Sequence, residues 1–179
     1  NLSTILTIIL AGGPLMKPCI FLDIDGVLNS NFWNDTHQRE ISDGTLIDEE
    51  KVMLLGQLIR NTSAKVILHS GWKFWFDSEV KPLRREAERL ISMLEKEGIK
   101  VNGVTPDHTT EEIRKSKKFS LVKASEILAW VSQYDNIEKW IVIDDLDLHN
   151  EEIRKHQILT DASIGLTVEN ICEAERLLL

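Results

Sequence analysis

The chain has 179 residues, close to the length of one ordinary domain, so a single compact unit is expected. With 42% hydrophobic and 28% charged residues, the composition fits a globular protein and excludes a disordered or collagen-like chain. A net charge of −8 disfavours nonspecific binding to nucleic acid or anionic membranes. The two cysteines, Cys19 and Cys172, are too few for a disulfide framework, which makes a cytoplasmic location the simpler expectation.

The most apolar stretch of the chain lies within residues 1–16. It is shorter than the roughly 18 apolar residues of a membrane span, and it lacks the basic flank of a secretory signal because the first positive charge is Lys17. Met16 directly precedes a strand-like run. We expect Met16 to be the natural start, with residues 1–16 as a non-native or poorly ordered extension and 17–179 as one domain. The alternative is an ordered segment that packs on the domain or on a neighbouring molecule.

Apolar runs and helical periodicities then alternate along the chain. The run at 19–22, which ends abruptly in Asp23, predicts a strand buried on both faces. Asp48 predicts the start of a helix, and a second strand is expected at 65–69.

A long amphipathic helix is predicted next. Pro82 suits its first turn, and Gly98 lies where a C-terminal cap belongs. Its apolar face is expected to consist of Leu83, Ala87, Leu90, Ile91 and Leu94. A third, weak strand is expected at 99–101.

Residues 103–119 show no apolar period and contain Pro106, so a loop is expected there. Ser120 is a candidate cap for the next helix, whose apolar stripe is expected to be Leu121, Ala124, Leu128 and Val131. Strands at 140–143 and 158–160 follow, and the last helix, capped by Thr167, buries Ile171, Ala174 and Leu178. The alternation of strands and helices predicts an α/β sandwich of three layers around a mostly parallel sheet of about five strands.

Polar residues follow three of the predicted strands. Asp23 and Asp25 come after the first, Ser70 after the second, and Asp144 with Asp145 after the fourth. In open parallel sheets, ligands bind at the carboxyl ends of the strands. Carboxylates gathered at this edge would repel one another unless a cation lay among them, and such oxygen ligands suit Mg²⁺. A phosphate dianion approaches an acidic cluster only through a metal and a positive side chain, so a phosphorylated substrate is predicted.

The spacing of the first acidic pair has its own chemistry. Residues i and i+2 of an extended chain point to the same side, so Asp23 and Asp25 are able to address one substrate. Asp23 is the candidate nucleophile that attacks phosphorus and forms an aspartyl phosphate. Asp25 is the candidate acid that protonates the leaving oxygen and later takes a proton from water. Gly26 lets the backbone turn away.

Three segments resemble motifs of the haloacid dehalogenase (HAD) superfamily of aspartate-nucleophile phosphatases. They are residues 21–29 (FLDIDGVLN), 66–70 (VILHS) and 140–147 (WIVIDDLD). More narrowly, the chain resembles the HAD-type domain of Swiss Army Knife RNA-repair proteins in four short segments: 70–73 (SGWK), 103–106 (GVTP), Glu126-Ile127 with Trp130, and 165–167 (GLT). The resemblance implies a Rossmann-like, HAD-like fold with Asp23 as nucleophile and Asp25 as acid and base. It also implies a Mg²⁺ site formed by Asp23, Asp25 (through its backbone carbonyl), Asp144 and Asp145.

On the substrate side, the resemblance implies that Ser70 and Lys123 hold the transferring phosphoryl group. Lys115, Lys117 and Lys118 are alternatives to Lys123 for this role. Further substrate contacts are expected from Gly71, Trp72 and Lys73. Gly71 and Lys73 depart from the familiar Ser-Ser-Trp-Arg form, and a lysine offers a point charge where arginine offers a planar fork.

The short interval between Asp25 and the second strand leaves room for only a small cap, or none, and hence predicts an open site. Residues 111–123 carry five Lys/Arg against two Glu, a local excess suited to a nucleic-acid backbone, and Trp33, Trp72 and Trp75 are candidates for stacking on bases. The expected function is therefore Mg²⁺-dependent phosphomonoester hydrolysis on a nucleotide or a nucleic-acid end, with no membrane partner. The alternatives are a small-metabolite phosphatase and a noncatalytic binding module that keeps the Mg²⁺ pocket.

Overall fold

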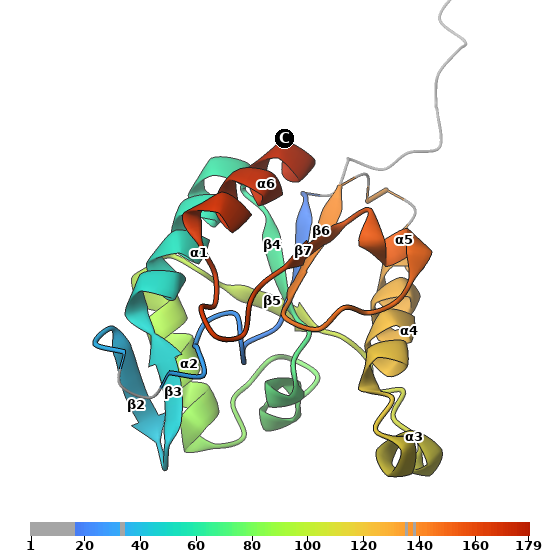
Figure 1. Cartoon of the computed structure of the whole chain (residues 1–179), viewed down its shortest axis with the longest axis horizontal. Helices are drawn as coiled ribbons and strands as arrows, with labels where there is room; N and C mark the ends of the chain where they lie inside the picture. Colours follow the sequence, from blue (N-terminus) through green and yellow to red (C-terminus); the bar gives the residue numbers. More distant parts are fainter. Residues whose placement is uncertain (1–16, 33–34, 135, 138) are drawn as a thin grey trace, which may run out of the picture.

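A computed structural model of the chain describes residues 17–32, 35–134, 136–137 and 139–179. Its centre is a five-stranded parallel sheet with the order β5-β4-β1-β6-β7 (Figure 1). The strands are β1 (Cys19–Leu22), β4 (Lys65–Leu68), β5 (Val101–Val104), β6 (Trp140–Asp144) and β7 (Gln157–Leu159). The predicted α/β fold is thus confirmed. The expectation for residues 1–16 lies outside the described residues, and so does the one for Trp33.

Helices cover both faces of the sheet, which makes three layers (Figure 1). One face is covered by α1 (Glu49–Thr62), α2 (Arg85–Lys96) and α6 (Val168–Leu178). The other is covered by α4 (Phe119–Val131) and α5 (Glu151–Arg154). Within β1, Ile20 and Leu22 pack in the first core, whereas Cys19 and Phe21 pack in the second. Burial on both faces explains why β1 is apolar at every position.

The strand register places the ends of three strands together. Leu22, the last residue of β1, lies opposite Leu68 of β4 and Ile143 of β6. The residues that follow these positions therefore emerge side by side at the carboxyl edge. They include Asp23 and Asp144, which the sequence predicts to meet there.

Three helix ends follow the sequence signals. The Asp48 side chain accepts a hydrogen bond from the Glu50 backbone N–H and caps α1. Thr167 and Asn170 form a reciprocal capping box at the start of α6. Gly98 adopts a φ of +72° just after α2, in the left-handed region that favours glycine.

The start of α2 differs from the prediction. The helix begins at Arg85, and Leu83 is 63% exposed instead of lying on the buried face. The Leu83 backbone N–H donates to the Trp75 carbonyl, and Pro82 bridges to Phe76. These contacts hold the segment against the preceding turn, so the helix starts later.

The predicted loop at 103–119 contains a short helix, α3 (Glu111–Ser116). The Thr110 side chain caps it, acidic residues occupy its first turn and basic residues its last, and it ends at Lys117 in the left-handed conformation. None of its residues is buried. Capping and charge therefore account for this helix. Because it buries no side chain, its sequence shows no apolar period from which the helix could be predicted.

The buried face of α4 also differs from the prediction. The helix starts at Phe119 without the expected Ser120 cap, and Leu121 is 55% exposed. Its buried residues are Val122, Ala124, Glu126, Ile127 and Trp130. This rotation turns Lys123 toward the carboxyl edge of the sheet. Two strands are shifted slightly, since β5 spans Val101–Val104 and β7 spans Gln157–Leu159.

An antiparallel hairpin, β2 (Gln38–Ser42) and β3 (Thr45–Asp48), forms the small structure between β1 and α1. Its turn is Asp43-Gly44, both with positive φ, a pair that is typical of tight hairpins. A short 3-10 helix, η1 (Gly71–Trp75), follows β4. In the described ranges, no helix combines the length and apolar character needed to cross a bilayer.

Candidate functional site

Three carboxylates converge at the carboxyl edge of the sheet. Asp23 follows β1, Asp144 ends β6 and Asp145 follows it, and one oxygen from each lies within 4.8 Å of the other two. Asp23 and Asp144 are almost completely buried, at 6% and 0% exposure. The structure thus brings together acidic residues that are more than a hundred positions apart in the chain.

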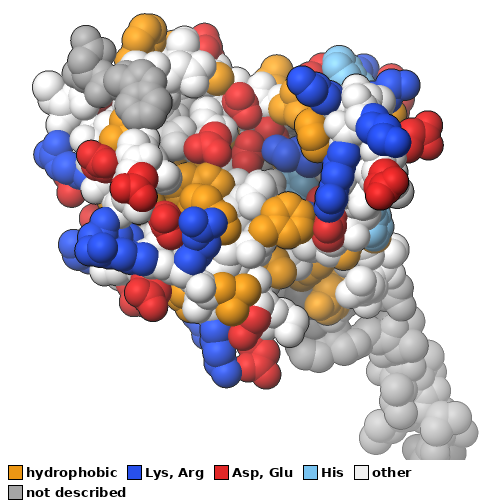
Figure 2. Space-filling view, turned by 90° about the horizontal axis from the view of Figure 1, so that it is seen from below, with side chains coloured by type: hydrophobic (Ala, Val, Ile, Leu, Met, Phe, Trp, Pro, Cys, Tyr) orange, Lys and Arg blue, Asp and Glu red, His pale blue; other side chains and the backbone are white. Residues whose placement is uncertain are grey.

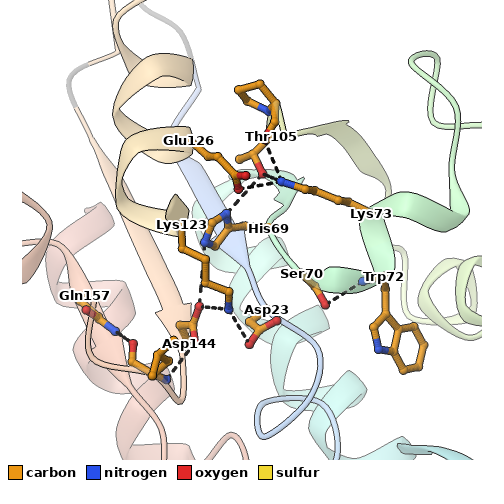
Figure 3. Close-up of polar contacts among 12 residues, drawn as sticks. Asp23, His69, Ser70, Trp72, Lys73, Thr105, Lys123, Glu126, Asp144 and Gln157 are labelled. Atoms are coloured by element: carbon orange, nitrogen blue, oxygen red, sulfur yellow. Dashed lines mark hydrogen bonds and ion pairs between the residues drawn. The ribbon is translucent and has the colours of Figure 1, made fainter. Parts of the chain in front are cut away.

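Lys123 of α4 is the cation that contacts this cluster (Figure 3). Its Nζ lies 3.1 Å from Asp23 Oδ2 and 2.6 Å from Asp144 Oδ2. Of the four lysines considered for the phosphate-holding role, Lys123 is the one that makes this contact. One ammonium against three carboxylates leaves an excess of negative charge, and clustered carboxylate oxygens are the donor type that Mg²⁺ prefers.

The close approach of the carboxylates changes the pKa values of the cluster. Burial, reinforced by the charge of Asp23, raises the pKa of Asp144 from 3.8 to about 7. The same two causes raise the pKa of Asp145. Burial pulls the pKa of Lys123 down, but Asp23 and Asp144 outweigh it, so the pKa lies above its ordinary value. The single positive charge of Lys123 therefore does not balance the three carboxylates.

The acidic pair after β6 is held from several sides. Asp144 Oδ1 accepts a hydrogen bond from the Leu146 backbone N–H at 2.9 Å, and Gln157 donates to the Leu146 carbonyl at 2.8 Å. Gly26 lies directly against Asp145: a Cβ on Gly26 would come within 2.6 Å of Asp145 Cγ. Because Gly26 also has a φ of +75°, the backbone turn and the close approach both require glycine there.

Asp25 is placed differently from the other predicted acids. Its carboxylate accepts hydrogen bonds from Trp72 Nε1 and from Asn29 Nδ2, each at 2.9 Å. Asn29 also accepts a hydrogen bond from the Gly26 backbone N–H, so it fixes the turn after β1. The Asp25 side chain lines a hollow of about 600 Å³ beside the hairpin. Asn29 was not singled out from the sequence, although it lies within the first motif.

Two of the three predicted stacking tryptophans lie in the described residues. Trp72 is 5% exposed, and its ring packs against that of Trp75 with centroids 4.6 Å apart. Arg84 lies over the Trp75 ring at 5.0 Å. These rings are therefore already occupied by protein contacts, and their binding of bases stays a prediction.

Ser70 lies at the end of β4 and caps η1. Its hydroxyl accepts a hydrogen bond from the Trp72 backbone N–H at 3.2 Å, and the residue is 3% exposed. Ser70, Gly71 and Lys123 line one cavity of about 340 Å³. Ser70, which follows β4, and Lys123, which lies on α4, thus share a cavity wall, and their binding of phosphate stays a prediction.

Lys73 has partners that differ from the expected phosphate. Its Nζ lies 2.7 Å from Glu126 Oε2, and it also donates to the Pro106 carbonyl at 2.8 Å and the Thr105 hydroxyl at 3.3 Å. Both charged residues are buried, with side chains 7% and 4% exposed. The ammonium has three N–H groups, so these contacts use its donors. These contacts tie η1 to α4, and Lys73 also lines the cavity that Ser70 and Lys123 share, so its binding of substrate stays a prediction.

His69 lies between the two lysines in the buried interior (Figure 3). Its Nδ1 is 3.3 Å from Thr105 Oγ1, and its Nε2 is 3.9 Å from Asp144 Oδ2. Nε2 has no hydrogen-bond partner in the described structure. Burial, together with the charges of Lys123 and Lys73, lowers the pKa of His69 well below 6.5, so its imidazole is neutral at neutral pH.

A family model described as the HAD domain in Swiss Army Knife RNA repair proteins matches residues 19–171. This range spans the whole sheet and every residue of the carboxylate cluster. No curated protein and no solved structure matches the chain.

Proposed function

The chain belongs to the HAD domain family of Swiss Army Knife RNA repair proteins, and from this premise we propose that it is a Mg²⁺-dependent phosphomonoesterase that forms an aspartyl phosphate. Family membership points to a phosphohydrolase. The finer assignment is supported above all by one observation: Asp23, Asp144 and Asp145 converge within 4.8 Å at the strand ends, with Lys123 against them.

The donor set fits a divalent metal. Three oxygen donors lie close enough to share one ion, and burial and mutual repulsion raise the pKa of Asp144 and Asp145 when only Lys123 balances them. Asp23, Asp144 and Asp145 would hold the ion through side chains, and Asp25 through its backbone carbonyl. When bound, Mg²⁺ supplies positive charge that offsets the charge of the phosphoryl group.

In the proposed first step, an Asp23 carboxylate oxygen forms a bond to phosphorus while the bond to the leaving oxygen breaks. Asp25 gives its proton to that oxygen. Ser70 and Lys123 hold the phosphoryl oxygens, as their shared cavity wall supports. In the second step, Asp25 takes a proton from water, the water oxygen bonds to phosphorus, and the bond to Asp23 breaks. Phosphate leaves and both carboxyl groups return to their starting states.

The hydrogen bonds to Asp25 support this division of labour. Trp72 and Asn29 each donate to a different oxygen of the Asp25 carboxyl group, which fixes the group away from the three clustered carboxylates. Two acidic residues in different surroundings suit one as nucleophile and the other as proton carrier. The proposed substrate is a phosphate monoester of a nucleotide or a nucleic-acid end. The local basic excess at 111–123 suits a phosphate backbone. The small size of the hairpin between β1 and α1 supports an open site.

The test is a screen of phosphate monoesters with Mg²⁺ and with EDTA, using wild type, Asp23→Asn and Asp147→Asn. Asp147 makes the matched control because it lies on the same loop as the acidic pair but outside the cluster. We expect turnover by wild type and Asp147→Asn only with Mg²⁺, and a loss of about 10³-fold or more in Asp23→Asn, with unchanged circular dichroism. Full activity in EDTA or in Asp23→Asn would refute the mechanism, and metal binding without turnover of any ester would favour the noncatalytic module.

A further inference from the structure

The 3-10 helix η1 separates two hollows at the carboxyl edge. Trp72 and Trp75 line the larger hollow, together with Asp25. Gly71, Lys73 and Phe74 line the smaller one, of about 340 Å³, together with Ser70 and Lys123. Figure 2 views the molecule from this side and shows hydrophobic, basic and acidic side chains meeting toward the middle of the face. Only the smaller hollow shares Ser70 and Lys123 with the proposed phosphate site.

The smaller hollow presents aromatic surface that is partly exposed, although Lys73 Nζ lies 5.5 Å from the centroid of the Phe74 ring. Phe74 of η1 is 56% exposed, and Phe119, the first residue of α4, is 44% exposed. Val122 adds a buried apolar contact to the lining. In the larger hollow, by contrast, Trp72 is buried and packed on Trp75. Large aromatic side chains exposed in a concave wall mark a binding site for an apolar group.

One cation at the smaller hollow makes no hydrogen bond or ion pair among the described residues. Lys73 is satisfied by Glu126, and Lys123 by Asp23 and Asp144. Arg114 of α3 also lines the cavity, yet within the described residues its guanidinium makes no hydrogen bond or ion pair. A guanidinium suits a planar or anionic oxygen group, such as a carboxylate or a phosphate. The lining therefore combines aromatic surface with a positive charge that is held in no ion pair of the described residues, although it interacts electrostatically with Asp107.

We propose that this cavity is a specificity pocket for the organic part of the substrate: a flat ring that lies against Phe74 and Phe119, with a second anionic group bound by Arg114. The proposal rests on the proposed function, because Ser70 and Lys123, which would hold the scissile phosphate, line this cavity, whereas Asp25, the proposed proton donor, lines the larger hollow. A purely aliphatic polyol phosphate would leave the aromatic surface and Arg114 unused. A ring without the second charge would use only the aromatic surface.

Three probes separate these features: adenosine 3′,5′-bisphosphate carries ring and second charge, adenosine 5′-monophosphate carries the ring alone, and glycerol phosphate carries neither. In wild type, kcat/KM is expected to fall in that order. Phe74→Ala and Phe119→Ala are expected to lower kcat/KM about tenfold for both adenosine probes and to leave glycerol phosphate unchanged. Arg114→Gln is expected to lower kcat/KM only for the bisphosphate, toward the value for the monophosphate.

The controls lie outside the cavity lining and outside the residues assigned to substrate. Leu121→Ala removes an apolar side chain from α4 that is 55% exposed, and Lys96→Gln removes a charge from the last turn of α2. Both are expected to behave as wild type with every probe. Equal effects of the Phe74, Phe119 and Arg114 substitutions on all three probes, or no effect on any, would overturn the pocket.

A binding measurement keeps this proposal separate from the catalytic one. Titration of adenosine 3′,5′-bisphosphate into Asp23→Asn protein with Mg²⁺ reports binding without turnover. We expect Kd to rise about tenfold when Phe74→Ala or Arg114→Gln is added. If the bisphosphate does not bind, or if Kd is the same with and without both substitutions, the proposed pocket is wrong even when the enzyme is active. Binding that responds to both changes while the wild type hydrolyses no ester would support the pocket and refute the phosphatase.

Discussion

Two lysines at the same edge of the sheet have opposite surroundings. Lys73 meets one carboxylate, Glu126, and fills its remaining donors with Thr105 and Pro106, so this ion pair is closed. Lys123 meets Asp23 and Asp144, with Asp145 close by, so this cluster has more negative than positive charge. The charges of Lys73 and Glu126 balance each other without a ligand. The carboxylate cluster keeps an excess of negative charge, which favours the binding of a cation.

The difference follows from where each group sits. Lys73 and Glu126 connect η1, which follows Ser70, to α4, which carries Lys123. Burying an ion pair seldom increases stability over an apolar pair, so its value here lies in fixing the relative positions of these elements. The pair thus ties η1 to the helix that carries Lys123, whereas the three carboxylates are placed by the ends of β1 and β6.

The largest expected effect comes from breaking the closed pair. Glu126→Leu leaves Lys73 buried without its partner and is expected to lower the free energy of unfolding by about 3–5 kcal/mol. Lys73→Met combined with Glu126→Leu removes both charges and is expected to recover most of that loss. Equilibrium urea unfolding measures both. Lys155→Ala, which breaks an exposed pair with Glu152, is the control and should change little. Wild-type stability in Glu126→Leu would contradict the role of the pair.

The carboxylate cluster is expected to bind Mg²⁺ more weakly when Asp145 is displaced. Gly26→Ala would place a Cβ 2.6 Å from Asp145 Cγ and is expected to weaken Mg²⁺ binding about 10–100-fold, as judged by titration calorimetry. Gly98→Ala is the matched control, because Gly98 has a similar positive φ but no atom within 4 Å of the added Cβ. If both variants bind Mg²⁺ equally well, Asp145 does not contribute to the site.

Trp72 and Lys73 are neighbours on η1 that serve different regions. Trp72→Phe removes the N–H that donates to Asp25 and is expected to lower kcat about tenfold with little change in KM, since a hydrogen bond to a charged group contributes about 1.5 kcal/mol or more. Trp75→Phe is the control because it keeps that bond. An equal loss in both variants would assign the effect to ring packing instead of to Asp25.

The pH dependence of stability probes the excess charge directly. The pKa of Asp144 is raised from 3.8 to about 7, so in this interval the folded metal-free protein binds a proton that the unfolded chain has released. Stability is then lost as the pH rises from about 4 to about 7, by at most about 1.4 kcal/mol per pH unit. Saturating Mg²⁺ should oppose this loss at the upper end. Thermal unfolding across this range measures both, and metal-free stability that rises with pH would contradict the assignment.

The sheet and much of the cluster were predictable because each strand is a short apolar run that stops at a polar residue. Asp23 and Asp144 follow directly from that pattern, and the parallel register brings them together. The caps at Asp48 and Thr167 were predictable for the same local reason. The hairpin was missed although Asp43-Gly44 signals a tight turn.

Other features depend on packing that no local pattern contains. The partner of Lys73 lies 53 positions away, on a helix face that the apolar stripe did not identify. The short helix α3 buries none of its residues, so it left no apolar period to find. Phe74 and Phe119 became candidates only when the structure showed them exposed around one cavity.

The central claim is that Asp23 becomes covalently phosphorylated. Acid quenching during turnover of a phosphate monoester with Mg²⁺, followed by peptide mass spectrometry, measures this most directly. The account predicts one phosphoryl group on the peptide that contains Asp23, absent in Asp23→Asn and absent with EDTA. Turnover without any phosphorylated Asp23, or a phosphoryl group on another residue, would contradict it.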